Sequence, residues 1–403
     1  MAIPSLRLSD IYLHLGQKST ISNPTLDIVN RVNVEELAIP TRAPNALVCA
    51  TFPTLIIWWS PKAISSISSP FLTCVSNLSS TKSQLTSSDS TSSHEPSFLS
   101  DVLTGLGDSQ RHLNCKYFYD LRGSQLFDAI CETDDYYVTR TELAIMDQYL
   151  EEMVEQIGRQ VMLLEYGSGS STKTRKLLAK LEQPAAYVPI DISEEHLLQA
   201  ANTLRELFPD IEVLPVTADF TSEFELPRSQ KEATHAAVYF PGSTIGNFPP
   251  AEAKQMLARF AKIVGSDGGL LIGFDRQKDP KTLEAAYNDS QGVTAAFNLN
   301  LLHRINRELG ADFDVDAFEH RAVYFHDEGR IEMQLVSKCA QTVNVGGKAF
   351  EFSSGEHIRT EYSHKYKIED FTALAAEAGF SLRKHWSDPK QYFAVMYFVQ
   401  NAD

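Results

Sequence analysis

The amino-acid sequence predicts an α/β fold in which a parallel sheet is covered by helices on both faces. Strand-length apolar runs alternate with helix-length segments from residue 139 to residue 276. These runs are apolar throughout, as expected for strands that are buried on both sides. The alternation stops near Asp279, and a β-rich stretch follows. We therefore expect a doubly covered sheet domain that is interrupted by a second, α+β domain.

The elements of the sheet domain can be placed from residue 97 onward. A short helix is expected at 97–105, and a long amphipathic helix at 139–158, where Leu143, Met146 and Leu150 fall on one apolar face. The remaining elements are expected in the order strand 161–166, helix 172–181, strand 185–192, helix 193–208, strand 211–220, strand and loop 235–248, helix 250–264 and strand 268–276.

The second domain is expected between the fifth strand and the last helix of the sheet domain. Residues 280–310 have a helical pattern, and residues 322–352 have the pattern of a β-meander with turns at 327–329 and 346–347. The chain is expected to finish with an extended segment at 358–366, a helix at 368–378 and a hairpin at 380–400.

The first hundred residues differ in composition from the rest. Serine is so frequent between Ser60 and Ser100 that this part cannot bury enough apolar surface to offset its ordering entropy. We expect residues 1–103 to be a low-complexity extension that is disordered over 60–97. For residues 1–59 two interpretations stay open: a weakly structured extension, or upstream sequence that a misplaced start has included.

Charge and cysteine spacing restrict the class of partner. The net charge is −16, and residues 1–100 contain as many acids as bases, so the whole excess lies in 101–403. Such a domain would repel a phosphate backbone, which favours a small-molecule ligand over nucleic acid.

Five scattered cysteines without a C-x-x-C pair predict neither disulfides nor a metal site, and favour a reducing, cytoplasmic compartment. The apolar run 46–59 is too short to span a membrane.

The stretch LLEYGSGSSTKT (163–174) resembles a nucleotide-binding loop, and its ligand can be weighed. A Walker A loop needs a glycine before Lys173, and a dinucleotide loop needs a third glycine at the same place, but Thr172 occupies it. The pattern Glu-x-Gly-x-Gly after an apolar strand fits S-adenosylmethionine better. Asp191 ends the next strand and can accept from both ribose hydroxyls. Asp219 and Phe220 end the third strand, and suit the adenine amine and the adenine ring.

Several further segments resemble one known family. They are FYDLRGSQLFDAI (118–130), DDYYVTRTE (134–142), YVPIDIS (187–193), FPGSTIGNF (240–248), AYNDSQGVTAAFN (286–298) and IRTEYSHKY (358–366). Together with the glycine loop, they resemble the histidine-specific Nα-methyltransferases of ergothioneine biosynthesis over about 104–403. The resemblance implies that three methyl groups pass from S-adenosylmethionine to the α-amine of L-histidine, giving Nα,Nα,Nα-trimethylhistidine (hercynine).

The resemblance also implies an architecture. We expect a class I (Rossmann-like) methyltransferase sheet domain formed by 140–277 and 366–403, and an α+β substrate-recognition domain formed by 104–139 and 278–365. The active site is expected between them, in a monomer without a metal.

Site residues follow from the same resemblance. The donor site is expected to contain Gly167, Lys173, Asp191, Asp219 and Phe220, with Lys173 reaching the donor's carboxylate. The substrate site is expected to contain Tyr119 as the catalytic residue near the reacting amine, the backbone of Gly242 beside it, Asn247 and Tyr287 at the substrate carboxylate, Tyr136, Glu361 and Ser363 at the imidazole, and Met333 near the side-chain pocket.

Simpler explanations exist for these residues. Tyr119 and Tyr136 are also typical packing residues, and Asn247 could cap the helix that follows it. Glu361 could pair with Arg359 at the surface. Tyr362 should point away from its two neighbours if this segment is a strand.

Rival functions also remain at this stage. One is methylation of another α-amine, such as that of a tryptophan derivative, and another is a non-catalytic S-adenosylmethionine-binding regulatory protein. A hydride-transferring Rossmann enzyme is disfavoured by the missing third glycine.

Overall fold

The computed structural model describes residues 51–52, 55–56, 97–169, 171–222 and 224–401, and the chain divides into two units, 1–88 and 89–403. In the first unit β1 (Thr51–Phe52) pairs with β2 (Leu55–Ile56) in an antiparallel manner. The rest of the expected N-terminal extension up to residue 96 lies outside the described residues.

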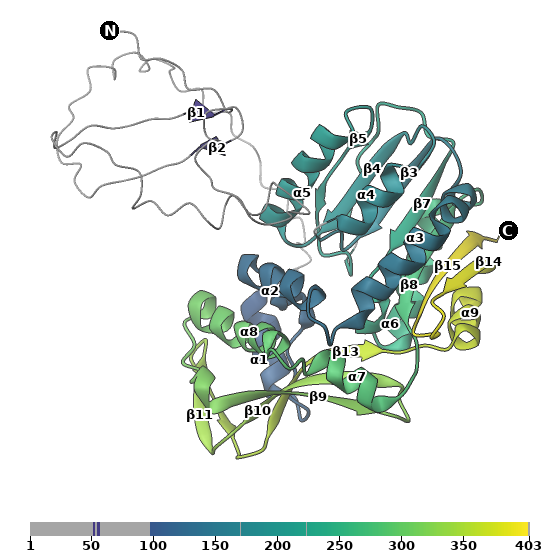
Figure 1. Ribbon diagram of the computed structural model, residues 1–403. Coiled ribbons are helices and arrows are strands. Elements are labelled where there is room, and N and C mark those ends of the chain that lie inside the picture. Colours follow the sequence, from purple (N-terminus) through teal and green to yellow (C-terminus); the bar gives the residue numbers. More distant parts are fainter. Residues whose placement is uncertain (1–50, 53–54, 57–96, 170, 223, 402–403) are drawn as a thin grey trace, which may run out of the picture. The chain divides into compact units, whose positions relative to one another are not determined.

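The second unit is built around an eight-stranded sheet (Figure 1). Its strands are β3 (Val161–Tyr166), β4 (Ala186–Asp191), β5 (Glu212–Val213), β6 (Val216–Thr217), β7 (His235–Phe240), β8 (Gly269–Asp275), β14 (Phe380–Ser387) and β15 (Phe393–Gln400). The order is β14-β15-β8-β7-β3-β4-β5, with β6 also paired to β4. Only the pairings that involve β15 are antiparallel. The strand order reverses beside β3, where α/β sheets bind their ligands.

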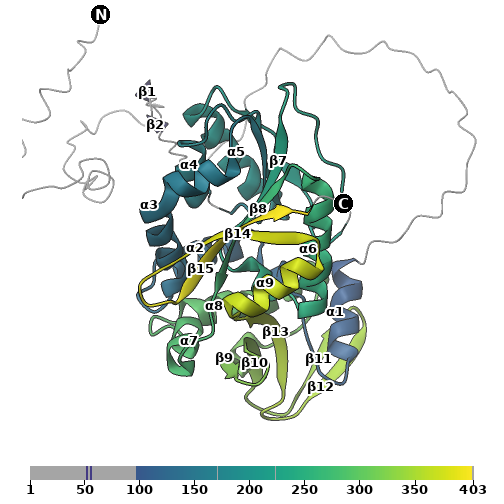
Figure 2. The ribbon, with the colours of Figure 1, turned by 90° about the vertical axis from the view of Figure 1, so that its right-hand side faces the viewer.

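Helices cover both faces of this sheet, as predicted (Figures 1 and 2). On one face lie α3 (Tyr137–Ile157), α4 (Thr172–Leu178) and α5 (Glu194–Leu207), and on the other α6 (Pro250–Val264) and α9 (Ile368–Glu377). Successive side chains of a strand point to opposite faces. Leu163 of β3 therefore joins the core under α3, whereas Leu164 joins the core under α6.

Two predicted elements were wrong in extent. The strand expected at 211–220 is reduced to the short β5 and β6, because Pro215 lies between them and has no N–H to donate to the sheet. The helix expected at 280–310 is two helices, α7 (Pro280–Tyr287) and α8 (Val293–Leu309). Asp289 ends the continuity by accepting from the backbone N–H groups of Val293 and Thr294 (2.9 and 2.7 Å), which caps the second helix.

The β-rich insertion between β8 and α9 is confirmed, although its pairing differs from a meander. Its strands are β9 (Phe318–Phe325), β10 (Arg330–Ser337), β11 (Gln341–Val345), β12 (Lys348–Phe352) and β13 (His357–His364). The hairpin β11–β12 forms its own sheet, and β13 returns to pair with β10 in the order β13-β10-β9. The shorter N-terminal and connecting helices are α1 (Phe98–Gly107), η4 (Cys115–Phe118), α2 (Leu121–Cys131), η5 (Thr244–Asn247) and η6 (Val315–Ala317). In Figure 1, α1, α2, α7 and α8 lie with this insertion.

The insertion is held tightly against the loop that follows β7. Gly246 of η5 lies so close to β13 that an added Cβ would sit 2.7 Å from the carbonyl oxygen of His364. A larger residue at Gly246 would push β13 away. The loop after β7 and strand β13 are consequently neighbours, although more than a hundred residues separate them in sequence. None of the described helices is both long enough and apolar enough to cross a lipid bilayer.

Candidate active site

The glycine loop leaves β3 in a backbone conformation that favours glycine. Gly167 and Gly169 have φ values of +72° and +46°. Glu165, the acid of the Glu-x-Gly-x-Gly pattern, points into the core instead of the loop. Its carboxylate accepts from the hydroxyls of Thr174 (2.6–2.7 Å) and Tyr187, and burial raises its pKa to about 7. Glu165 thus ties β3 to α4 and β4, which shapes the loop.

A cavity with about 920 Å³ of empty space opens beside this loop. Four of the five predicted donor residues line it, namely Gly167, Asp191, Asp219 and Phe220. They meet there because their strands end at the same edge of the sheet. Asp191 accepts from the backbone N–H groups of Gly169 (3.2 Å) and Ser193 (2.9 Å), and burial raises the pKa of its carboxyl.

A segment outside the sheet also lines this cavity. Lys116 of η4 donates to the Asp219 carboxylate (3.0 Å), which also accepts from the backbone N–H of Thr221 (2.9 Å). Phe220 makes edge contacts with Tyr166 and Phe248, with ring centroids 5.8 and 6.3 Å apart.

The residues present fit S-adenosylmethionine. At Gly169 an added Cβ would meet no atom within 4 Å, so the cavity reaches the backbone itself. Asp191 can accept from ribose hydroxyls while its other bonds keep it in place.

Lys173 occupies a different place from the other four donor residues. Its ammonium donates to the buried carboxylate of Glu142 on α3, and Glu142 also accepts from the backbone N–H of Gly242 at 3.0 Å. Sequence reasoning missed Glu142. The signal was present, because Glu142 shares the buried face of α3 with Val138 and Met146 at helical spacing. An acid on an apolar face requires a partner.

A second cavity, with about 510 Å³ of empty space, adjoins the first. All eight predicted substrate residues line it: Tyr119, Tyr136, Gly242, Asn247, Tyr287, Met333, Glu361 and Ser363. They come from the ends of η4, η5, α7 and β7, the start of α3, and strands β10 and β13. Met333 and Glu361 are direct partners across the β10–β13 pair.

Tyr119 and Asn247 lie where the two cavities meet, since both residues line both cavities. Tyr119 packs edge-on against Phe127 and Phe297, with ring centroids 5.9 Å away in each case. Burial raises the pKa of its phenol well above 10, so the hydroxyl is neutral. The suggestion that Asn247 caps the next helix is wrong, because Pro249 precedes α6 and no side chain caps it.

Glu361 lies in the second cavity and has no hydrogen-bond partner among the described residues. Burial raises the pKa of its carboxyl to about 7, and the nearby Lys365 ammonium opposes this rise. The surface ion pair with Arg359 is not formed, since the Arg359 guanidinium lies over the ring of Tyr362, 4.0 Å from its centroid. Glu361 and Ser363 line the cavity and Tyr362 does not, so Tyr362 points to the opposite face of the strand, as predicted.

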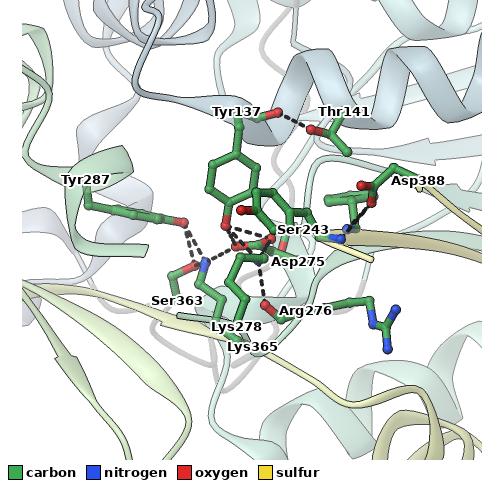
Figure 3. A network of polar contacts seen from close by, with 12 residues as sticks. Tyr137, Thr141, Ser243, Asp275, Arg276, Lys278, Tyr287, Ser363, Lys365 and Asp388 are labelled. Atoms are coloured by element: carbon green, nitrogen blue, oxygen red, sulfur yellow. Dashed lines mark hydrogen bonds and ion pairs between the residues drawn. The ribbon is translucent and has the colours of Figure 1, made fainter. Parts of the chain in front are cut away.

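A buried polar network supports the substrate cavity from behind (Figure 3). Lys365 donates to the hydroxyls of Tyr287 (2.9 Å) and Ser363 (2.8 Å) and pairs with Asp275 (3.0 Å). Asp275 also accepts from Tyr137 and pairs with Lys278. Sequence reasoning missed Lys365, although it continues the alternation of Glu361 and Ser363 along one face.

The mostly parallel sheet, its reversal beside β3 and the glycine loop with acids at the neighbouring strand ends define a class I, Rossmann-like, S-adenosylmethionine-dependent methyltransferase. A family model described as histidine-specific, S-adenosylmethionine-dependent methyltransferase matches residues 98–400, so the chain belongs to that family.

The chain is also similar to individual proteins. A histidine N-alpha-methyltransferase from Mycolicibacterium smegmatis is 40% identical over 74% of this chain and 94% of its own length. Ergothioneine biosynthesis protein 1 from Neurospora crassa is 29% identical over 71% of this chain and 33% of its own length. A solved S-adenosylmethionine-dependent methyltransferase from Clostridium acetobutylicum is 12% identical, with a TM-score of 0.39, over 69% of this chain and 96% of its own.

Proposed function

We propose that this protein transfers three methyl groups from S-adenosylmethionine to the α-amine of L-histidine and releases hercynine for ergothioneine biosynthesis. The observation that carries the proposal is the unpaired Glu361 carboxylate beside the Ser363 hydroxyl, in a cavity that adjoins the donor cavity at Tyr119. A carboxylate and a hydroxyl at one end suit the two nitrogens of an imidazole. Relatives named for histidine methylation support the same substrate.

At the donor end, we assign Asp191 to the ribose hydroxyls and Asp219 with Phe220 to the adenine. Lys173 would neutralise the carboxylate of the donor, with Glu142 holding its ammonium near Gly242. S-adenosylmethionine supplies an electrophilic methyl group on a sulfonium centre. The chain's task is to hold the acceptor nitrogen in line with that methyl.

At the reacting nitrogen, we assign the principal role to Tyr119. Histidine arrives with a protonated α-amine, so a proton must leave before the nitrogen lone pair can attack. The neutral Tyr119 hydroxyl can accept a hydrogen bond from that nitrogen and pass the proton outward through its own O–H. Each transfer then forms one N–C bond and breaks one S–C bond. After the third transfer the nitrogen is quaternary, and aromatic faces such as that of Tyr119 favour the cation.

At the far end, Glu361 would accept from one imidazole N–H, and Ser363 would donate to the other nitrogen. Tyr287 and Asn247 would hold the carboxylate, while Met333 and Tyr136 enclose the ring. A substrate without an imidazole N–H would leave the Glu361 carboxylate desolvated and unpaired, which costs about 1–3 kcal/mol or more. This penalty is the basis of selectivity in the proposal.

The division into domains is also a proposal. Residues 104–139 and 278–365 would recognise the substrate, and 140–277 with 366–403 would bind the donor. The separate sheet β13-β10-β9 supports this division. We further propose a cytoplasmic monomer, because all assigned residues come from one chain and the cysteine pattern suits a reducing compartment.

Purified protein should be incubated with S-adenosylmethionine and each of a panel of amino acids, and the products followed by mass spectrometry. Histidine is expected to gain one, two and then three methyl groups. Methylation of tryptophan or its derivatives without methylation of histidine would refute the substrate assignment. A fungal relative named N-methyltransferase fsqC, from Aspergillus fumigatus, is 25% identical over 74% of this chain and 82% of its own; its name specifies no amine, so amines other than histidine belong in the panel. Donor binding without methylation of any amine would support the regulatory alternative.

A further inference from the structure

Lys365 is buried behind the substrate cavity and carries a full complement of hydrogen bonds. Its side chain is entirely buried, as is that of its partner Asp275. Its three N–H groups are directed to the Tyr287 hydroxyl, the Ser363 hydroxyl and the Asp275 carboxylate, at 2.9, 2.8 and 3.0 Å. A lysine ammonium has three donors and no acceptor. Lys365 therefore has no hydrogen left for a ligand.

The ammonium is charged in this setting. Burial alone would lower the pKa of Lys365, but the negative charge of Asp275 and the bond to Tyr287 outweigh burial and raise it. Asp275 also pairs with a second lysine: Lys278 Nζ lies 2.5 Å from Asp275 Oδ1. The Lys365 and Lys278 ammonium groups therefore share the Asp275 carboxylate. Lys365 is separated from the substrate cavity by the hydroxyls of Tyr287 and Ser363, to which it donates.

This arrangement decides which way those hydroxyls act. Each oxygen must accept from Lys365, so each keeps its own hydrogen to donate elsewhere. Tyr287 OH and Ser363 Oγ lie 2.7 Å apart, so without a ligand one of the two hydrogens bridges the pair. A substrate with two acceptor atoms can accept from both hydroxyls. The Tyr287 and Ser363 oxygens still accept from the Lys365 ammonium after the hydrogen bond between the two hydroxyls is broken.

We propose that Lys365, held by Asp275, is a positioning residue that presents Tyr287 and Ser363 to the substrate as hydrogen-bond donors. This inference rests on the proposed function and deepens it. The acceptors would be a carboxylate oxygen at Tyr287 and the unprotonated nitrogen of a neutral imidazole at Ser363. An imidazolium carries an N–H on both ring nitrogens and offers the Ser363 hydroxyl no acceptor, so this arrangement favours the neutral ring.

The test compares Lys365→Met with Lys278→Met. Both variants remove one lysine from the same carboxylate and leave Asp275 paired with the other, so neither strands a buried charge. Only Lys365 touches the two hydroxyls, since Lys278 contacts Tyr137 and the carbonyl of Arg276 instead. We expect Lys365→Met to raise the KM for histidine by about 10- to 100-fold, as for lost charge-assisted hydrogen bonds, and Lys278→Met by less than about threefold.

A second readout separates positioning from a merely structural role. The Lys365 ammonium opposes the rise in the pKa of Glu361, so its removal should move the acid limb of the kcat/KM profile for histidine to higher pH. Among the described residues, the other titratable groups whose pKa the Glu361 charge affects are Tyr119, Tyr136, Tyr287 and Cys115. Burial raises the pKa of each, so they are neutral across this range. Lys278→Met should leave the limb in place.

The outcomes are separable. Binding of S-adenosylhomocysteine, measured by calorimetry, shows whether each variant is folded. If Lys365→Met does not fold, Lys365→Gln replaces it, and we expect the same rise in the KM for histidine and the same shift of the acid limb. Equal histidine KM values and unshifted acid limbs in the Lys365 and Lys278 variants would overturn the inference. Failure of the unaltered protein to methylate histidine would instead refute the proposed function.

Discussion

Replacing Glu361 by glutamine should make the enzyme more stable at alkaline pH and a poorer binder of histidine. Burial raises the pKa of Glu361 from 4.5 to about 7. The folded state thus binds a proton more tightly than the unfolded state, and stability falls as pH rises from about 4.5 through about 7. A shift of this size corresponds to at most about 3 kcal/mol above pH 7. Glutamine carries no charge and avoids that cost.

The same substitution removes a charged acceptor from the substrate cavity. A charge-assisted hydrogen bond contributes about 1.5–3 kcal/mol, so we expect the KM for histidine to rise about 10- to 100-fold. In the unaltered enzyme, histidine affinity should fall below about pH 7 as the carboxyl becomes protonated. Affinity for S-adenosylhomocysteine should change little, because Glu361 does not line the donor cavity.

Denaturant unfolding at pH 5 and pH 8.5, together with histidine titrations at saturating donor, would measure both effects. Glu332→Gln is the matched control, because Glu332 lies on the neighbouring strand, pairs with Arg330 at 2.7 Å and does not line the substrate cavity. The control should lose stability and keep its histidine KM. A Glu361→Gln variant that is less stable than the unaltered enzyme at pH 8.5, or that loses donor and histidine binding equally, would refute the reasoning.

Other changes test the remaining assignments. Tyr119→Phe should lower kcat by about 10- to 100-fold, because a neutral phenol only relays the proton, and single-turnover kinetics should show unchanged donor binding. Asp191→Ala should raise the KM for S-adenosylmethionine about 10-fold or more through the loss of two hydroxyl bonds, and an equal rise for histidine would contradict its role. A chain that begins at Ser97 should keep full methylation activity, because the family match spans 98–400; a lost or slowed reaction would show that the preceding residues take part.

Much of the fold could be predicted from the sequence because its signals are local. Apolar runs of strand length and the two loop glycines depend on the nearest residues, and they placed the parallel strands and the loop after β3 correctly. Predictions failed where one residue overrides a pattern. Pro215 reduces the third strand, and Asp289 divides the long helix by capping its second half.

Candidate site residues could be predicted because segments that resemble the family supplied them, and the structure brings all eight substrate residues into one cavity. Their individual roles stay predictions. Residues that act through others were missed. Glu142 and Lys365 lie within or beside the recognised segments, yet their partners are Lys173, Gly242 and Asp275, all distant in sequence.

The sequence by itself determined the class of fold, the donor loop and the set of residues that could meet a substrate, since these depend on local pattern and residue type. Only the tertiary structure decided the electrostatics of the site. Glu361 next to Arg359 has the sequence pattern of a surface ion pair, whereas in the folded chain it is an unpaired acid in a cavity, with Lys365 behind it. Desolvation and charge pairing depend on every element packed around a group, and no stretch of sequence contains that information.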